Sequence, residues 1–120
     1  MKILVCEDDP VVLKTMEVAL SQAGDAIHLA KNGEVALDLL GKSSYDLIFT
    51  DIHMPYATGA DVLDFVYKQQ EKRTPVVIIS SDDVEEVVTM AKKMGVHSFL
   101  SKPVSVDKVR QIVKDLRPNQ

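Results

Sequence analysis

Most residues of this chain that could do chemistry stand directly after short apolar runs. Glu7 and Asp8 follow the first such run, and Asp51 follows another near the middle of the chain. Ser80 and Lys102 hold similar places after two later runs. Carboxylates that lie close together repel one another, so a site built from this set should bind a cation.

The donor types favour a hard cation. The ligands would be oxygen atoms alone, because no His or Cys stands at metal-binding spacing. Mg²⁺ is commonly held by a few carboxylates together with water and a phosphoryl group. Lys102 would add a fixed positive charge and Ser80 a hydroxyl donor, and both suit phosphoryl oxygens. The remaining carboxylate would then be available as a nucleophile toward phosphorus.

The apolar runs that carry these residues are short and rich in β-branched side chains, which predicts strands. Between them, apolar residues recur three or four positions apart, as in amphipathic helices; the clearest examples cover 84–94 and 106–116. The predicted strands are Lys2–Cys6, Ala26–Ala30, Leu47–Thr50, Val76–Ser80 and Ser98–Leu100.

Strand and helix alternate five times along the chain. Strands joined through helices run parallel with right-handed crossovers, and five units are too few to close a barrel. We therefore predict an α/β fold: a doubly wound, five-stranded parallel sheet of order 2-1-3-4-5. The first and last helices should cover one face and the other three the opposite face. Ligands bind beyond the carboxyl ends of such strands, so the polar residues above should converge there.

Turn and cap residues mark the ends of the predicted helices. Asp9 is expected to cap the first helix rather than bind metal, and Gly24 to end that helix. Asn32 and Ser105 are predicted N-caps of later helices. The tail, residues 117–120, is expected to be either the frayed end of the domain or the start of a removed segment.

Length and composition limit the class of protein. The 120 residues suit one domain, 1–120, and 46% hydrophobic with 27% charged residues is ordinary globular usage. A net charge of −4 argues against non-specific binding of nucleic acid or anionic membrane. No run approaches the roughly 20 apolar residues of a membrane span, and no signal-peptide core follows Met1. We therefore expect a cytoplasmic protein.

Four stretches, in this order and at these strand ends, resemble the receiver domain of two-component response regulators, a CheY-like family with a flavodoxin-like (βα)5 fold. The resemblance covers the whole chain. The matching stretches are residues 3–10, residues 46–55 with Gly59 beyond them, residues 75–81 and residues 99–103.

This resemblance implies a phosphorylation switch in which Asp51 accepts a phosphoryl group from a phosphohistidine donor. The donor would be a sensor histidine kinase or a histidine phosphotransfer protein. The resemblance also implies that Mg²⁺ is bound by Glu7, Asp8, Asp51 and the backbone carbonyl of His53. The protein would catalyse nothing beyond Mg²⁺-dependent transfer to itself and its own dephosphorylation.

The same resemblance implies how the signal leaves the site. Lys102 would pair with the phosphoryl group and form a cis peptide bond with Pro103. Ser80 would be the switch hydroxyl and Phe99 the switch aromatic. Their movement would alter the face formed by the helix at 84–94, the following strand and the last helix, and so control a partner or an output domain.

Three departures from the usual family pattern affect kinetics rather than the assignment. Glu7 replaces the commoner Asp, Ser81 replaces Ala or Gly, and residues 56–58 make the loop after Pro55 bulkier. His53 and Asp82, two positions after Asp51 and Ser80, should flank the path of attacking water. We therefore expect a long-lived phosphoryl state.

Two other functions fit parts of this pattern less well. A phosphatase with an aspartyl nucleophile would carry a second Asp two residues after Asp51, where His53 stands, and a cap insertion. A scaffold that is never phosphorylated should have lost acidic residues or the lysine, and all are present. The sequence leaves open whether the domain stands alone or begins a longer protein.

Overall fold

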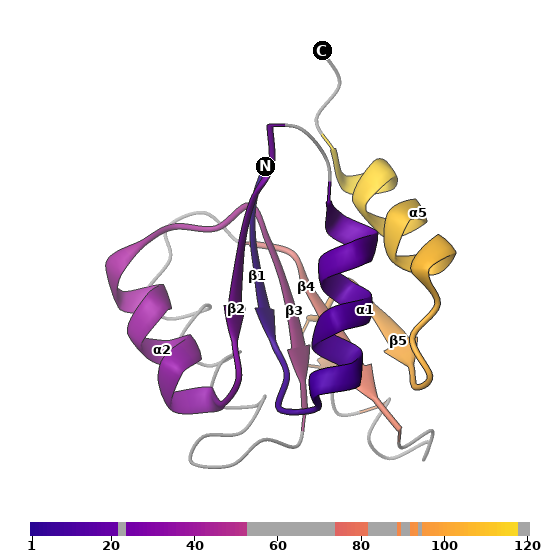
Figure 1. Cartoon of the computed structure of the whole chain (residues 1–120), viewed down its shortest axis with the longest axis horizontal. Coiled ribbons are helices and arrows are strands. Elements are labelled where there is room, and N and C mark those ends of the chain that lie inside the picture. The colour runs from indigo at the N-terminus through magenta and orange to yellow at the C-terminus, as the bar shows by residue number, and fades with distance from the viewer. Residues whose placement is uncertain (22–23, 53–73, 82–88, 90–91, 94, 118–120) are drawn as a thin grey trace.

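The fold is organised around one parallel sheet. The computed structural model describes residues 1–21, 24–52, 74–81, 89, 92–93 and 95–117. Five strands pair in the order β2-β1-β3-β4-β5, which confirms the predicted topology. Their carboxyl ends all lie along the lower edge in Figure 1. The strands are β1 Lys2–Cys6, β2 Ala26–Ala30, β3 Leu47–Asp51, β4 Val76–Ser80 and β5 Ser98–Ser101.

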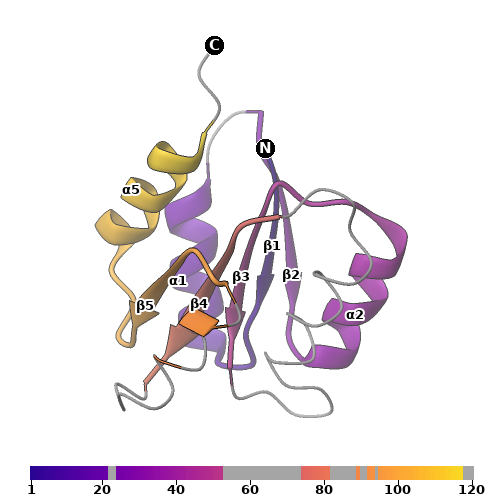
Figure 2. The ribbon, with the colours of Figure 1, turned by 180° about the vertical axis from the view of Figure 1, so that it is seen from behind.

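Helices cover both faces of the sheet. The helices are α1 Pro10–Leu20, α2 Gly33–Lys42 and α5 Val106–Leu116. Figures 1 and 2 show α1 and α5 on one face and α2 on the other, as predicted. The predicted helix between β3 and β4, and most of the predicted helix at 84–94, lie outside the described residues.

Burial on both faces explains why the central strands β1, β3 and β4 are mostly apolar. Alternate side chains of each strand point to opposite faces. One set, which includes Phe49 and Ile79, packs with α1 and α5, and the other, which includes Ile48 and Ile78, packs near α2. Burying each of these large side chains contributes about 1.5–3 kcal/mol. This packing leaves the strand ends as the places where polar side chains can gather.

The predicted N-caps are confirmed, and one predicted helix end is wrong. Asp9 accepts a hydrogen bond from the Val11 N–H at 2.9 Å, and Asn32 and Ser105 cap α2 and α5. However, α1 ends at Leu20, where the Ser21 N–H donates to the Val18 carbonyl. Gly24 is therefore not the cap of α1. Its φ of 92° serves the turn before β2 instead.

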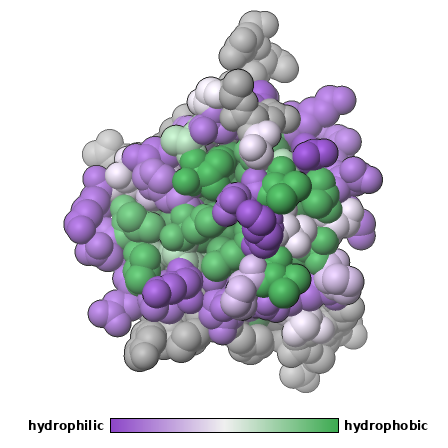
Figure 3. Space-filling view, viewed as in Figure 1, coloured by the Kyte–Doolittle hydropathy of each residue, from purple (hydrophilic) through white to green (hydrophobic). Residues whose placement is uncertain are grey.

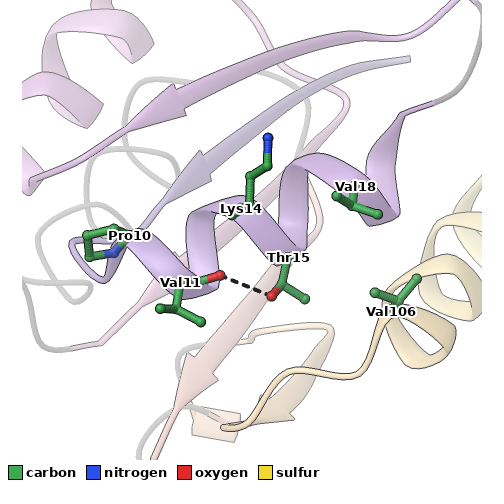
Figure 4. A pocket seen from close by; sticks show the side chains of 6 residues that line it. All are labelled: Pro10, Val11, Lys14, Thr15, Val18 and Val106. Carbon is green, nitrogen blue, oxygen red and sulfur yellow. Dashed lines mark hydrogen bonds between the residues drawn. The ribbon is translucent and has the colours of Figure 1, made fainter.

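The outer face of α1 carries exposed apolar side chains, Val11 and Val18, and Figure 3 shows the hydrophobic surface there. A groove of about 470 Å³ runs beside them, between α1 and the start of α5 (Figure 4). Its lining offers the Lys14 ammonium and the Thr15 hydroxyl, which donates to the Val11 carbonyl at 3.0 Å. No carboxylate lines this groove, so the predicted chemistry lies elsewhere. Within the described residues, no helix is both long and apolar enough to cross a membrane.

Candidate functional site

The strand register brings the predicted site residues together. Cys6 pairs with Thr50 across β1 and β3, so the next residues, Glu7 and Asp51, leave the sheet side by side. On the other side of β3, β4 pairs with β5 as far as Ser80 and Ser101. The Lys102 N–H then donates to the Ser80 carbonyl at 3.0 Å. Four strands thus deliver their polar ends to one edge of the sheet.

Lys102 ties two carboxylates together at this edge. Its Nζ lies 2.7 Å from Asp51 Oδ2 and 3.1 Å from Glu7 Oε1. Partial burial favours the neutral amine, but hydrogen bonds to Asp51 and Glu7 outweigh it, so the pKa of Lys102 is raised. Lys102 therefore remains a permanent positive charge in contact with Asp51.

Glu7 is the most constrained member of the site. Its side chain is 0% exposed, and its Oε1 accepts hydrogen bonds from Lys102 Nζ and from the Asp9 N–H at 3.1 Å. Its Oε2 is the single buried side-chain oxygen or nitrogen in the described part of the chain that has no hydrogen-bond partner. Burial and then the neighbouring Asp51 carboxylate raise the pKa of Glu7 to about 8. An orphaned buried oxygen of this kind calls for a ligand.

The geometry fits a small divalent cation. Glu7, Asp8 and Asp51 each offer a carboxylate oxygen, and these oxygens lie within 4.8 Å of one another. We call these three residues and Lys102 the acidic cluster. Asp8 is exposed, whereas Glu7 and Asp51 are buried, so an ion would be reached from the solvent side. The all-oxygen donor set suits Mg²⁺.

The remaining predicted residues lie around this cluster or outside the described part. Ser80 is buried at the end of β4, and Ser81 beside it is exposed. Phe99 is half-buried opposite Ile78, on the same face of the sheet as Ser80. The Lys102–Pro103 peptide bond is cis, as expected. His53 and Asp82 lie outside the described residues.

Thr50 is a polar contact of the site that the sequence analysis did not single out. It is fully buried, and its hydroxyl donates to the backbone carbonyl of Asp51 at 3.0 Å. A threonine that interrupts an apolar strand directly before an acid was the available signal. Cys6, on the adjacent strand, is buried, and its burial raises the pKa of its thiol to about 12, so the thiolate is not formed near neutral pH.

Known proteins are similar to this chain in sequence and in fold. The family model of the response regulator receiver domain matches residues 3–114. The chain is 30% identical to the response regulator protein PilR of Pseudomonas aeruginosa over 112 residues, which cover 93% of the chain and 25% of PilR. The chain thus spans a quarter of the length of this relative.

Solved structures give the same picture. The receiver domain of the Francisella response regulator 1452 superposes with a TM-score of 0.85 and 33% identity, and the match covers 96% of this chain and 94% of the other. The chemotaxis response regulator CheY4 of Vibrio cholerae gives a TM-score of 0.86 and 26% identity, over 97% and 98% of the two chains. The family match over residues 3–114 includes the strand ends that carry the acidic cluster.

Proposed function

The chain belongs to the receiver domain family of response regulators, the phosphorylation-switched signalling domains of two-component systems, and we propose that its phosphoacceptor is Asp51. The observation that carries the proposal is the 2.7 Å contact between Asp51 and Lys102 beside a second, orphaned carboxylate. The site thus places a potential nucleophile, Asp51, beside a fixed cation, Lys102. Receiver domains are signalling switches rather than enzymes and work with histidine kinases and output domains.

The proposed reaction moves one phosphoryl group. A carboxylate oxygen of Asp51 bonds to phosphorus while the P–N bond of a phosphohistidine breaks, and the electron pair of that bond stays on the imidazole nitrogen. The Lys102 ammonium offsets the negative charge on the phosphoryl oxygens, and the Ser80 hydroxyl donates a hydrogen bond to one of them. The donor is a histidine kinase or a histidine phosphotransfer protein.

Mg²⁺ is the proposed cofactor, which receiver domains typically use. Glu7, Asp8, Asp51 and the backbone carbonyl of His53 would hold it. When bound, the ion neutralises charge shared between the phosphoryl group and these carboxylates. The orphaned Oε2 of Glu7 and the 4.8 Å grouping of the carboxylate oxygens support this assignment.

The proposed output follows from two residues on one face of the sheet. Ser80 moves toward the phosphoryl group, and Phe99 follows it inward, because both side chains lie on the face away from α1 and α5. The change reaches the surface made by the helix at 84–94, β5 and α5, where a downstream protein or output domain binds. Residues 1–120 act as one domain in the cytoplasm, without direct contact to nucleic acid or membrane.

The phosphoryl group is proposed to be long-lived. Exposed Ser81 adjoins Ser80, and with His53 and Asp82 it would narrow the approach of water to phosphorus. Replacing His53 by Ala should therefore speed the loss of phosphate from purified phosphoprotein. An unchanged rate would remove any role for the His53 side chain in the lifetime of the phosphoryl group.

Intact-mass spectrometry with acetyl phosphate and Mg²⁺ tests the phosphoacceptor. We expect one added phosphoryl group on the native protein, none on Asp51→Asn and none when a chelator removes the metal. Asp38→Asn is the matched control, because Asp38 is exposed and pairs only with Lys42 among the described residues. Equal labelling of Asp51→Asn and the native protein would overturn the assignment.

A further inference from the structure

A second ionic cluster lies at the opposite edge of the sheet, where the strands begin. Asp25 directly precedes β2, and its side chain is only 3% exposed. Both its oxygens accept hydrogen bonds from the guanidinium of Arg117, Oδ1 from Nη1 at 3.0 Å and Oδ2 from Nη2 at 2.7 Å. The Met1 α-ammonium also donates to Oδ1 at 2.8 Å. The carboxylate is thus fully engaged, and Figure 1 shows the end of α5 beside the N-terminal residue.

Arg117 belongs to the last turn of α5. It is the C-cap of the helix, and its N–H donates to the Val113 carbonyl at 2.9 Å. Its guanidinium is 33% exposed, so solvent reaches only part of the pair. Two turns earlier, Arg110 donates to the carbonyls of Val18 and Ala19 near the end of α1, at 3.5 and 3.3 Å. These hydrogen bonds hold the C-terminal half of α5 against α1 and Asp25.

The other end of α5 is connected to the acidic cluster. Ser105, the N-cap of α5, stands three residues after Lys102, whose Nζ contacts Asp51. The 11 residues of α5 span roughly 16 Å between these two ends. One helix therefore links Lys102 at one edge of the sheet with Asp25 at the other.

We propose that Asp25 and Arg117 form a latch that fixes the C-terminal end of α5, so that a displacement of Lys102 moves only the first turns of the helix. The bidentate pairing of a planar guanidinium with a carboxylate fixes both groups in one relative geometry. Its effect on signalling, though not its existence, rests on the proposed phosphorylation of Asp51. The latch sets which part of α5 can change when the receiver is switched.

Hydrogen exchange of the unmodified protein tests the latch itself. In Arg117→Gln, the amides of residues 116 and 117 should exchange at least tenfold faster than in the native protein. Asp25→Asn should give the same pattern from the other partner. Lys114→Gln is the control, since Lys114 is exposed on the same helix and has no ion-pair partner among the described residues. Native-like exchange in both latch variants would overturn the proposal.

Exchange after treatment with acetyl phosphate and Mg²⁺ tests the coupling. In the native protein, changes should appear in residues 104–109 and not in residues 114–117, whereas in Arg117→Gln they should reach residue 117. Changes at 114–117 of equal size in both proteins would overturn the confinement by the latch. If the intact mass shows no added phosphoryl group, the proposed function fails instead, and the exchange result on unmodified protein still decides the latch.

Discussion

The two ionic clusters at opposite edges of the sheet have opposite charge balances. The acidic cluster sets three carboxylates against the single ammonium of Lys102. At the other edge, one carboxylate, Asp25, meets both the Arg117 guanidinium and the Met1 ammonium. The same kinds of groups are thus combined in a deficit of positive charge at one edge and a surplus at the other.

The difference shows in the carboxyl groups themselves. Glu7 has a buried oxygen without a partner, and its burial raises its pKa to about 8. Hydrogen bonds from Arg117 lower the pKa of Asp25 to about 2, against the effect of its burial. An unsatisfied group in a folded protein points to a ligand, whereas a saturated one points to a structural role. The unpaired oxygen of Glu7 therefore marks a binding site, whereas the fully hydrogen-bonded Asp25 marks a structural contact.

Removing the saturated carboxylate should have the largest effect on stability. Asp25→Asn leaves the Arg117 guanidinium, which is 33% exposed, without its counter-charge, and hydrogen bonds to charged groups contribute about 1.5–3 kcal/mol each. Urea unfolding at pH 7 measures this free energy. Asp38→Asn, which breaks an exposed pair with Lys42, should cost less than about 0.5 kcal/mol. Similar losses of unfolding free energy in Asp25→Asn and Asp38→Asn would show that the Asp25 pair stabilises the protein no more than an exposed pair does.

Replacing Glu7 by Gln, by contrast, should remove a loss of stability that the native protein shows as pH rises. The pKa of Glu7 is about 8 in the folded protein, above its ordinary value of 4.5. The contribution of Glu7 to the free energy of unfolding is therefore fully present below pH 4.5 and is lost as pH rises toward 8. Without metal, the native protein should lose up to about 3 kcal/mol more than Glu7→Gln between pH 5 and pH 7. Urea unfolding in chelator at both pH values measures this difference, and parallel pH profiles would argue against it.

Acid should weaken the Asp25 cluster in a different pH range. The pKa of Asp25 is lowered from 3.8 to about 2, so its contribution is fully present above pH 3.8 and is lost as pH falls through 2. The loss amounts to about 2 kcal/mol. Arg117→Gln should lack most of this acid-dependent loss, as acid titration followed by circular dichroism would show. Identical acid curves would mean that Arg117 does not hold the Asp25 carboxylate.

Mg²⁺ should stabilise the acidic cluster and leave the other one untouched. At a free Mg²⁺ concentration ten times the Kd, binding adds about 1.4 kcal/mol to the free energy of unfolding. Asp8→Asn should weaken the ion's effect, because it removes one of the three grouped carboxylates. Asp25→Asn should show the full increment on its lower baseline. A metal increment lost in Asp25→Asn and kept in Asp8→Asn would place the ion elsewhere.

The sequence predicted the strands and their ends well, because both follow from local patterns, whereas the sheet order, also predicted, depends on contacts between distant segments. Short apolar runs of three to five residues predicted every strand to within one residue. The runs are clearest in β1, β3 and β4, because strands covered on both faces need apolar side chains at most positions. Parallel strands then force Glu7, Asp51 and Lys102 to one edge, whatever the details of packing. The N-caps followed from side chains that bond their own neighbours.

Contacts between distant segments were decided only in three dimensions. Nothing near Asp25 or Arg117 in the sequence links residues 92 positions apart. Arg117 was expected at a frayed end or at the start of a removed segment, not in an ion pair with Asp25. The orphaned oxygen of Glu7 likewise depends on tertiary structure, because Lys102 donates to Glu7 Oε1 and to Asp51 Oδ2 and leaves Glu7 Oε2 without a partner. The sequence determined which groups reach each edge of the sheet. Only packing decided which of them are satisfied, because burial and hydrogen-bond geometry belong to the assembled chain.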